Sequence, residues 1–340
     1  MKKVWFNRWF SVAYHYMNSI RNNEDGMAFK MYATHPDRAH MALQAADYAD
    51  TEPVLGDDDY IEFALGFCKQ HGIDVFIPRL HMYAIAKHLD EFEKIGTRVT
   101  VCRDLELLEN LLEKQKFYEA IRDKNILSIP DYHVVNTADQ FMDAYKSLSH
   151  AGHQVCMKPT NAEGGTGFRI ISNERNALKD LFGTVTPYLT SDQAYRTLSS
   201  VERFDDLMVM ELLGGYEYSI DCLATASGEL LAAVPRRKAD GRLRVLEEVP
   251  ELIEIANKVA AAYRIPFNYN IQVKYNQGVP KLLEINPRMS GGLHVTCLSG
   301  INFPYLAVKS ILGGQVEIQK PRFGITASHI ETYMIMNLGE

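Results

Sequence analysis

Residues 158–168 read KPTNAEGGTGF, and residues 282–288 read LLEINPR. The first stretch joins one lysine to a glycine-rich loop. The second places a carboxylate, Glu284, two positions before an amide, Asn286, so both side chains leave the same face of a strand. A lysine, flexible backbone donors and hard oxygen ligands are what a nucleoside triphosphate and its magnesium ions require. The two stretches together therefore indicate an ATP-dependent enzyme.

The composition argues against several other classes of protein. The chain of 340 residues has a net charge of −7, which gives no electrostatic support to nonspecific binding of nucleic acid or of a membrane surface. Its 5 cysteines form no Cys-x-x-Cys pair, so we expect reduced core cysteines rather than a zinc site. No run approaches the ~20 apolar residues of a membrane span. We therefore expect a cytoplasmic protein without nucleic-acid or membrane partners.

Residues 1–104 predict an α/β domain. Strands are expected at 4–6, 73–77 and 98–102, and helices at 11–20 and 59–71. Gly72 closes the second helix, and Pro78 ends the strand after it. This alternation predicts a small, mainly parallel sheet, and the lack of Gly-x-Gly-x-x-Gly after the first strand disfavours a dinucleotide site. Arg79 and His81 follow a strand end, where such sheets meet ligands, so Arg79 is a candidate substrate contact.

The glycine-rich loop is expected to connect two strands, at 154–158 and 168–171. One helix is predicted at 105–124, and Thr137 is predicted to cap another, with Gln140 reaching back. A phosphate loop of the Walker type runs from a strand into a helix and carries its lysine after the glycines. Here Lys158 precedes the glycines, so we interpret the loop as a hairpin lid.

The rest of the chain is rich in strands, with one helix expected at 252–263. Strands are predicted at 207–211, 216–224, 230–235, 270–275 and 281–285. The last two form a hairpin around Gln277 and Gly278. If that hairpin is centred on Gly278, Gln272 lies opposite Glu284. Three oxygen-bearing groups, those of Gln272, Glu284 and Asn286, would then converge within the ~5 Å spacing of cross-strand neighbours.

The order of these motifs resembles the ATP-grasp superfamily, nearest to its carbamoyl phosphate synthetase-like and amino-acid ligase branches. The resemblance covers roughly residues 105–314. It is carried by Lys116 in a helix, by residues 157–167, by residues 209–221, and by residues 271–272 with 284–288. The chain also has the general character of ATP-grasp proteins associated with tellurite-resistance operons, although no single motif carries that likeness.

The resemblance implies a Rossmann-like α/β domain followed by a two-lobed ATP-grasp fold. The first domain would span residues 1–104 and the ATP-grasp domain residues 105–340. Within the latter, the smaller lid-bearing lobe would cover about 125–212 and the metal-binding lobe about 213–340.

The resemblance also implies residues that bind ATP. Lys116 and Lys158 would contact its phosphates, and the lid glycines would close over the triphosphate with their N–H groups. Glu217 would accept hydrogen bonds from the ribose. The remaining nucleotide contacts would be Gly164, Gly165, Thr166 and Gly167 in the lid, and Glu211, Leu212 and Leu213 at the adenine. Lys116 has an equally good alternative as part of a solvated helix face. Glu211 could simply end a strand, but a buried glutamate needs a partner.

The metal and the substrate would be held by the second motif. By the resemblance, Glu284 and Asn286 bind Mg2+, with Gln272 as a neutral third member; two ions are expected, and Mn2+ is an alternative. Arg288 would contact the activated substrate, and it and Lys158 are the catalytic candidates. Further substrate contacts are assigned to Ser290, Gly291, Arg236 and Lys238. Residues 236–238 are equally well a solvated loop, and we expect His294 to be packed.

We therefore expect an ATP-dependent carboxylate ligase. The γ-phosphate of ATP would pass to a small-molecule carboxylate, and an amine, or another nucleophile such as a thiol, would attack the acyl phosphate. The alternatives are a bicarbonate-activating enzyme like carbamoyl phosphate synthetase, a small-molecule kinase and a nucleotide-binding regulator that has lost catalysis. A homodimer is compatible with the sequence, and neither the carboxylate nor the nucleophile is identified by it.

Overall fold

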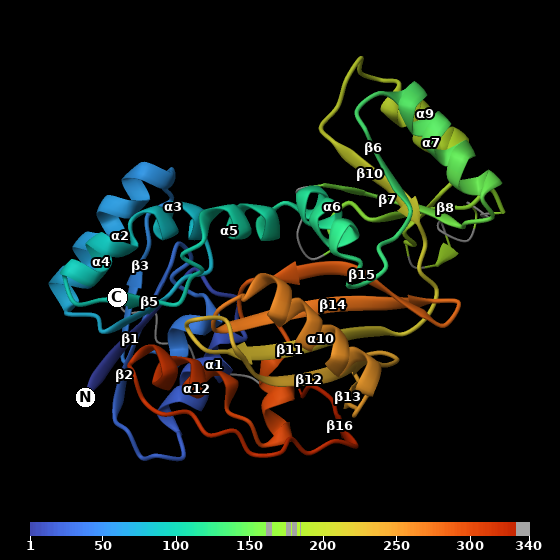
Figure 1. Ribbon diagram of the computed structural model, residues 1–340. Coiled ribbons are helices and arrows are strands. Elements are labelled where there is room, and N and C mark those ends of the chain that lie inside the picture. Colours follow the sequence, from blue (N-terminus) through green and yellow to red (C-terminus); the bar gives the residue numbers. More distant parts are fainter. Residues whose placement is uncertain (161–164, 175–177, 179–181, 184, 331–340) are drawn as a thin grey trace. The chain divides into compact units, whose positions relative to one another are not determined.

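The computed structural model describes residues 1–160, 165–174, 178, 182–183 and 185–330, apart from the side chain of Asp123. The chain forms two compact units, drawn in Figure 1. The first unit comprises residues 1–112, 216–273 and 284–340, and the second comprises residues 113–215 and 274–283. Among the described residues, no helix has both the length and the apolar character needed to cross a membrane.

The first unit begins with a parallel sheet in the order β3-β2-β1-β4-β5. Its strands are β1 (Lys2–Asn7), β2 (Phe29–His35), β3 (Tyr48–Thr51), β4 (Val75–Ile77) and β5 (Arg98–Val99). Both faces of β1 are buried, as expected for a central parallel strand. The predicted parallel sheet is confirmed, but the sequence prediction omits β2 and β3 and makes β5 too long.

Helices cover both faces of this sheet. Val4 and Phe6 pack with α1 (Ala13–Arg21), the short η1 (Met41–Ala45) and α12 (Phe303–Ile311), while Trp5 faces the helices of the other side. Those helices are α2 (Asp57–His71), α3 (Met82–Lys87), α4 (Leu89–Lys94) and α5 (Leu105–Leu112). Gly72 ends α2 with a φ of 60°, as predicted for a left-handed C-terminal residue.

The second unit is built on a sheet in the order β6-β10-β7-β8-β9. Its strands are β6 (Tyr132–Val135), β7 (Val155–Pro159), β8 (Arg169–Ile171), β9 (Tyr188–Leu189) and β10 (Leu207–Glu211), and its helices include α6 (Lys114–Lys124), α7 (Ala138–His150) and α9 (Ser191–Leu198). Phe141 and Leu148 of α7 pack on β7 and β10. Because β7 and β8 pair antiparallel, the glycine-rich loop connects two strands, as predicted.

The prediction of one helix at 105–124 is wrong. The chain is extended at Glu113, with φ of −109° and ψ of 106°, and this residue separates α5 from α6. Leu108 of α5 belongs to the core of the first unit, whereas Tyr118 of α6 is buried in the second and donates to the carbonyl of Leu283 at 2.8 Å. Each helix therefore belongs to the unit whose core contains its buried apolar side chains.

The third sheet has the order β15-β14-β11-β12-β13-β16. Its strands are β11 (Glu217–Ala224), β12 (Leu230–Lys238), β13 (Arg244–Leu246), β14 (Asn268–Asn276), β15 (Val279–Asn286) and β16 (Ile325–Ala327), accompanied by α10 (Pro250–Tyr263), α11 (Leu293–Thr296) and η2 (Cys297–Ser299). Gln277 and Gly278, with φ of 48° and 82°, form the two-residue turn of the predicted hairpin. The strand predicted at 230–235 continues to Lys238, so residues 236–238 are not a loop.

Candidate functional site

Three predicted site residues form a continuous polar run at the end of β15. Asn286 Nδ2 donates to Glu284 Oε1 at 2.9 Å, and Arg288 Nη2 donates to Asn286 Oδ1 at 3.2 Å. All three side chains are half-buried. The structure thus brings together the carboxylate, the amide and the guanidinium that the sequence singled out.

This run fits a hard divalent cation by its donor chemistry. The carboxylate of Glu284 and the amide oxygen of Asn286 are the ligand types that Mg2+ takes in proteins. No group of three or more Asp, Glu, His or Cys side chains suited to a metal occurs among the described residues. A site here would therefore rely on neutral amide oxygens beside one carboxylate, as proposed for Gln272. Gln272 is half-buried on β14. The two-residue turn is centred between Gln277 and Gly278 rather than on Gly278, so regular pairing would set Gln272 opposite Leu283, and its convergence with Glu284 stays a prediction.

Arg236 lies in a buried polar network that holds the chain just beyond Arg288. The residue is 3% exposed, and its Nε donates to Asp221 Oδ2 at 3.1 Å and to Thr296 Oγ1 at 2.9 Å. Its Nη2 donates to Ser290 Oγ at 3.0 Å, while the hydroxyls of Ser290 and Thr296 donate to Asp221 at 2.6 and 2.5 Å. For Arg236 the alternative of a solvated loop is therefore wrong, because β12 carries its side chain into the interior.

The glycines after Ser290 fit closely around this network. A Cβ added to Gly292 would lie 2.4 Å from Arg236 Cζ, whereas one added to Gly291 would meet nothing within 4 Å. The backbone carbonyl of Ser290 also accepts a hydrogen bond from the buried hydroxyl of Tyr16. Arg236 thus positions residues 288–292, and its direct contact with a substrate stays a prediction.

Glu217 and Lys238 are directly opposite each other on β11 and β12, and their side chains form an ion pair. Arg237 instead forms an ion pair with Glu247 at 2.7 Å. The two candidates Glu217 and Lys238 are therefore neighbours.

In the second unit, Glu211 is a buried carboxylate with a complete set of partners. It accepts hydrogen bonds from the backbone N–H of Asp131 at 2.9 Å, from Asn276 Nδ2 at 2.8 Å and from the ammonium of Lys281. Burial alone would raise the pKa of this carboxyl, but the bonds from Lys281, Asp131 and Asn276 outweigh it and hold the pKa below its usual value. The expectation that a buried glutamate here needs a partner is met by Lys281, together with Asp131 and Asn276. Because protein groups satisfy the side chain, its role is to fix the strand end that leads into Leu212 and Leu213.

Lys158 lies half-buried on β7, opposite Met208 of β10. Burial raises the pKa of the nearby Cys156 thiol to about 12, and the positive charges of Lys158 and Lys274 oppose that rise. The ammonium groups of Lys158 and Lys274 therefore both influence the surroundings of Cys156. Sequence reasoning missed Lys274, although its spacing of two from Gln272 on β14 puts both side chains on one strand face.

The described part of the glycine-rich loop is a tight turn, in which Phe168 N–H donates to Gly165 O at 3.1 Å. Gly165 and Gly167 have φ of 80° and 74°, which favours glycine at both positions. A Cβ on Gly167 would lie 2.7 Å from Pro159 Cδ, so the end of the loop packs against the end of β7. Thr166 is exposed, and Gly164 lies outside the described residues.

Lys116 and His294 are held by contacts with neighbouring side chains. Lys116 is 43% exposed and pairs with Glu113 at 3.0 Å, which agrees with the alternative of a solvated helix face, and its phosphate contact stays a prediction. His294 is half-buried and stacks on His15 with ring centres 4.6 Å apart. Burial, and then the neighbouring His15, His329 and Arg236, lower the pKa of His294 to about 4.

Comparisons with known proteins agree with the motifs and with the fold. Residues 203–333 match the family model described as ATP-grasp in the biosynthetic pathway with Ter operon. The carbamoyl phosphate synthase large chain of Methanobrevibacter smithii is 20% identical over 278 residues, which are 78% of this chain and 25% of that protein. The matched residues 203–333 include β11, β12, β14 and β15 with Glu284, Asn286 and Arg288.

Solved structures share the ATP-grasp fold over nearly the whole chain. N5-carboxyaminoimidazole synthetase from Staphylococcus aureus, complexed with ADP, has a TM-score of 0.67 at 13% identity, covering 93% of this chain and 78% of that one. The biotin carboxylase domain of Hydrogenobacter thermophilus 2-oxoglutarate carboxylase, with MgADP and bicarbonate, has a TM-score of 0.64 at 14% identity and covers 96% and 73%. An L-amino acid ligase from Bacillus licheniformis has a TM-score of 0.60 at 14% identity and covers 92% and 74%.

These likenesses confirm the predicted architecture of an α/β domain followed by an ATP-grasp fold. The chain spans only about a quarter of the length of the curated relative that it matches over most of its own length. The comparisons therefore show the fold and a family match over residues 203–333, and the reaction is a matter for the site.

Proposed function

We propose that this ATP-grasp protein is a Mg2+-dependent ligase that activates a small carboxylate with ATP and joins it to an amine or another nucleophile. The observation that carries the proposal is the hydrogen-bonded run of Glu284, Asn286 and Arg288. It places metal-type oxygen ligands directly beside a guanidinium suited to a carboxylate or an acyl phosphate. The names of the similar proteins, which include a synthetase, a carboxylase domain and an amino-acid ligase, support the same class of reaction.

We assign ATP binding to the residues predicted to contact its phosphates and to those predicted to contact its adenine and ribose. Lys158, joined by Lys116, would bind the phosphates, and the turn at Gly165–Gly167 would present N–H groups to them. The strand end fixed by Glu211 would offer the backbone of Leu212 and Leu213 to adenine. Glu217 would accept the ribose hydroxyls. This last contact competes with its ion pair to Lys238, so nucleotide binding would separate Glu217 from that ammonium.

Glu284 and Asn286, with Gln272, would hold Mg2+, which when bound neutralises phosphate charge during transfer of the γ-phosphoryl group. Arg288 would bind the carboxylate through its planar fork and keep it in line for attack on the phosphorus. Arg236, through Ser290 and Gly292, would hold the backbone beyond Arg288, where the N–H of Gly291 can face the developing acyl phosphate. An amine then displaces phosphate from the acyl carbon. We place the enzyme in the cytoplasm, and a homodimer is compatible with this proposal.

Bicarbonate is the second candidate for the activated carboxylate. The similarity to a carbamoyl phosphate synthase and to a carboxylase domain with bound bicarbonate favours it. The two candidates share the first step, which is phosphorylation of a carboxylate oxygen, and differ in the acid consumed.

The experiment is an ADP-release screen with Mg·ATP against pooled carboxylates, bicarbonate and amines, followed by trapping with hydroxylamine. A carboxylate that stimulates ADP release and yields a hydroxamate supports the ligase, whereas stimulation by bicarbonate alone supports the second candidate. A stable phosphorylated product that hydroxylamine does not trap would indicate a kinase. ATP binding without stimulation by any acid would indicate a regulator.

Glu284→Ala provides the negative control for this screen. The variant should lose Mg-dependent ADP release and most of the stabilisation by Mg·ATP in melting curves, because it lacks the only charged ligand in the proposed set. Glu254→Ala, at a 60% exposed position on α10, is the matched variant and should behave as wild type. Equal ATP-induced stabilisation in all three proteins would contradict the metal assignment.

A further inference from the structure

We propose that a groove beside β5 binds a small amphipathic acid, and that this ligand acts on the pocket at Arg288 across a shared wall. The groove has a volume of about 610 Å³ and is lined by residues of α4, of the chain around β5, of the chain around Pro266 and of the end of α12, all in the first unit. That volume lies within the ~300–1,000 Å³ range of small-molecule sites. Binding in the groove does not depend on the proposed function, whereas its effect on the reaction rests on it.

Apolar side chains and one arginine define the class of ligand. Leu89, Val101 and Ile311 contribute to the apolar part of the lining. Arg98, on β5, is exposed; its Nη1 donates to the carbonyl of Ile311, and it forms no ion pair with a carboxylate of the described residues. The other N–H groups of its guanidinium are suited to a carboxylate. The groove therefore suits an acid whose anionic group meets Arg98 and whose apolar body meets the wall.

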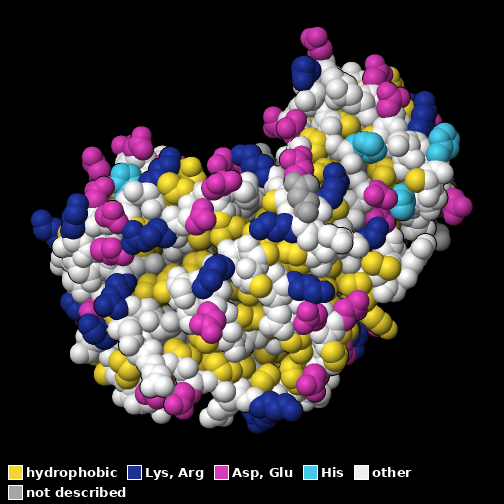
Figure 2. Space-filling model, in the orientation of Figure 1, with side chains coloured by type: hydrophobic (Ala, Val, Ile, Leu, Met, Phe, Trp, Pro, Cys, Tyr) yellow, Lys and Arg dark blue, Asp and Glu magenta, His cyan; other side chains and the backbone are white. Residues whose placement is uncertain are grey.

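Acidic side chains already neutralise the second arginine of the groove. Arg103 Nη1 donates to Asp90 Oδ1 at 2.7 Å, and its Nη2 pairs with Glu93. Figure 2 shows acidic and basic side chains close together on the surface around α4. Among the residues that line the groove, all of which the structure describes, Arg98 is thus the cation without an acidic partner. A single such charge favours a monoanion over a dianion.

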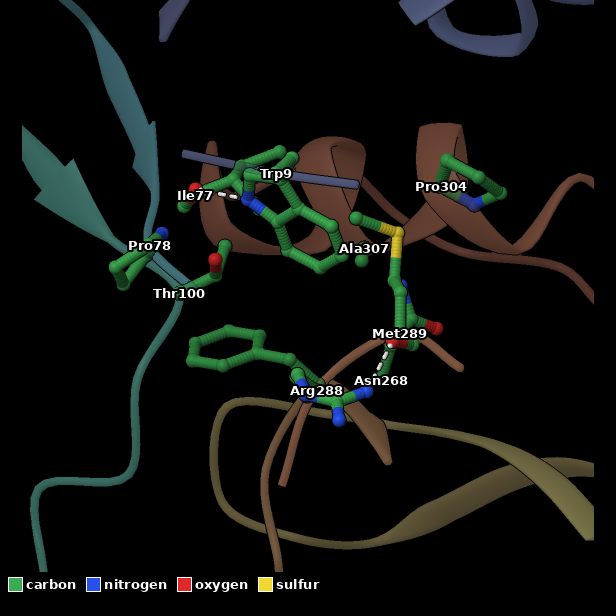
Figure 3. Close-up of a pocket in the computed structure, with 10 residues that line it drawn as sticks. Trp9, Ile77, Pro78, Thr100, Asn268, Arg288, Met289, Pro304 and Ala307 are labelled. Atoms are coloured by element: carbon green, nitrogen blue, oxygen red, sulfur yellow. Dashed lines mark hydrogen bonds between the residues drawn. The ribbon is translucent and has the colours of Figure 1, made fainter. Parts of the chain in front are cut away.

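The groove shares its wall with the small pocket beside Arg288. Figure 3 shows that pocket, with Trp9, Thr100 and Arg288 among its lining residues. Its volume of about 20 Å³ holds little more than one water molecule. Val99 and Val101, on either side of Thr100, line the groove instead. Successive residues of this segment therefore face the two cavities in turn.

Two other segments of the wall are divided in the same way. Pro266 lines the groove, Asn268 lines the pocket, and Phe267 lines both. On α12, Ala307 lines the pocket and Ile311, about one turn further along, lines the groove. A ligand in the groove would therefore contact residues whose neighbours line the pocket, and it would contact Phe267 directly.

Phe267 has a strained conformation in this wall. Its φ of 60° lies in the left-handed region, which is unusual for an aromatic residue. The N–H of Ala224 donates to Phe267 O at 2.8 Å, but the N–H of Phe267 reaches Thr225 O only at 3.5 Å. The residue is 7% exposed, so the packing around it holds it in this conformation. A ligand that adds contacts on the groove side would change that packing and press the ring toward the pocket.

The next residue, Asn268, has a buried oxygen without a partner. The residue is 7% exposed, and its Nδ2 donates to Phe303 O at 3.2 Å. Its Oδ1 has no hydrogen-bond partner in the part of the chain that the structure describes. Because no hydrogen bond holds Oδ1, this side of the amide can follow a shift of Phe267. We expect that shift to reduce the small space beside Arg288 and to weaken binding of the carboxylate there.

Displacement of the fluorescent probe anilinonaphthalene sulfonate tests the groove, because the probe joins one anionic group to an apolar ring system. Phenylpropionate should displace it from the wild type, and propionate and the uncharged phenylpropionamide should need concentrations about tenfold higher or more. Arg98→Gln should weaken probe binding by a similar factor. Ala226→Trp, which fills the groove from an exposed position, should do the same and keeps the test valid if Arg98→Gln does not fold. Ala226→Ser and Lys94→Gln, at an exposed position of α4, are the controls.

Trp9 tests the shared wall without turnover. It lines the pocket, is 2% exposed and is one of the 2 tryptophans of the chain. Phenylpropionate should change the tryptophan emission of the wild type and of Trp5→Phe, and leave that of Trp9→Phe and Arg98→Gln unchanged. An emission that stays constant in the wild type while the probe is displaced would overturn the connection across the wall.

The ADP-release assay tests the consequence for the reaction. Phenylpropionate should raise the KM for the reacting carboxylate about fivefold or more and leave the KM for ATP unchanged, and Arg98→Gln should not respond. An unchanged KM in an active wild type, or an equal rise in Arg98→Gln, which indicates direct competition at Arg288, would overturn this effect. If no acid supports turnover but probe binding depends on Arg98 and Trp9 responds, the ligase proposal fails and the groove with its connection to the pocket stands. If Arg98→Gln and Ala226→Trp bind the probe as the wild type does, the groove assignment is overturned while the ligase proposal stands.

Discussion

Arg236 and Asp221 form an ion pair almost entirely removed from solvent, with Nη2 and Oδ2 3.1 Å apart and side chains 3% and 1% exposed. Ser290, Thr296 and Asn270 supply further hydrogen bonds to Asp221. A buried pair is tolerable only when such bonds satisfy both charges. The pair therefore connects β11 and β12 with the chain that follows Arg288, and it fixes the shape of the proposed acyl site.

Replacing one partner of this pair should be costly. Arg236→Met leaves the carboxylate of Asp221 buried without its cation, and we expect a loss of about 3–5 kcal/mol in the free energy of unfolding. The double variant Asp221→Asn with Arg236→Met should recover part of that loss. Arg237→Gln, which breaks the more exposed pair with Glu247, should cost about 1 kcal/mol or less. Urea unfolding of the four proteins measures these differences, and equal losses for Arg236→Met and Arg237→Gln would contradict the assignment.

The histidine stack predicts a loss of stability in mild acid. Burial, with His15, His329 and Arg236 nearby, lowers the pKa of His294 to about 4 from an ordinary value of 6.5. The unfolded chain then takes up a proton more readily than the folded one, so this contribution to stability is present above pH 6.5 and is lost as the pH falls toward 4. Because His294 is only half-buried, we expect a loss on the order of 1–2 kcal/mol between pH 7 and pH 5.

The variant His294→Gln should reduce this pH dependence. Urea unfolding at pH 7 and pH 5 measures it, with His150→Gln at the exposed end of α7 as the control. An unchanged difference between the two pH values in His294→Gln would mean that the acid sensitivity arises elsewhere.

The two described glycines of the lid differ in a way that can be tested. Gly165→Ala and Gly167→Ala both place a side chain at positive φ, but only the second brings a Cβ to 2.7 Å from Pro159. The expected cost of the left-handed conformation alone is about 1–2 kcal/mol at either position. We expect Gly167→Ala to weaken binding of a non-hydrolysable ATP analogue about tenfold, and Gly165→Ala only a few-fold, because the clash displaces the loop from β7.

Calorimetry with magnesium present measures both affinities. Hydrogen exchange at Gly165–Phe168 should slow on binding in the wild type and less so in Gly167→Ala. If the analogue leaves exchange at these amides unchanged in the wild type, the loop is not a lid.

Local patterns in the sequence were sufficient to predict the strands that carry the motifs. β10 coincides with its predicted bounds, and the hairpin turn at Gln277 and Gly278 lies where predicted, because an apolar run or a Gly-containing turn determines each. The parallel strand β3 reads YADT and is mostly exposed. Its sequence therefore has no apolar pattern from which the strand or its pairing with β2 could be predicted. The break at Glu113 has no local signal either, since helix-forming residues lie on both sides and tertiary packing decides where each half goes.

In the candidate site, too, contacts between residues close in sequence could be predicted, and contacts between distant residues could not. Glu284, Asn286 and Arg288 are adjacent in the sequence, and their contact follows from strand geometry. The partners of Arg236 lie 15, 54 and 60 residues away, so the run of three basic residues could not be distinguished from a solvated loop. The contacts of Arg79 and Arg288 with the ring of Phe10 also could not be predicted, because only the fold brings these residues together.

Arg288 provides the last prediction, which separates substrate activation from nucleotide binding. Arg288→Lys keeps the positive charge but loses the planar fork and the hydrogen bond to Asn286 Oδ1. Because the guanidinium is assigned to the acceptor rather than to ATP, the affinity for the ATP analogue should stay within a few-fold of wild type. Ligation should fall by on the order of 10²-fold, the size expected when one transition-state donor is lost. Hydroxamate yield per ADP released, compared between Arg288→Lys and wild type, measures how much activation survives. A variant that loses ATP affinity and ligation in equal proportion would place Arg288 at the nucleotide instead.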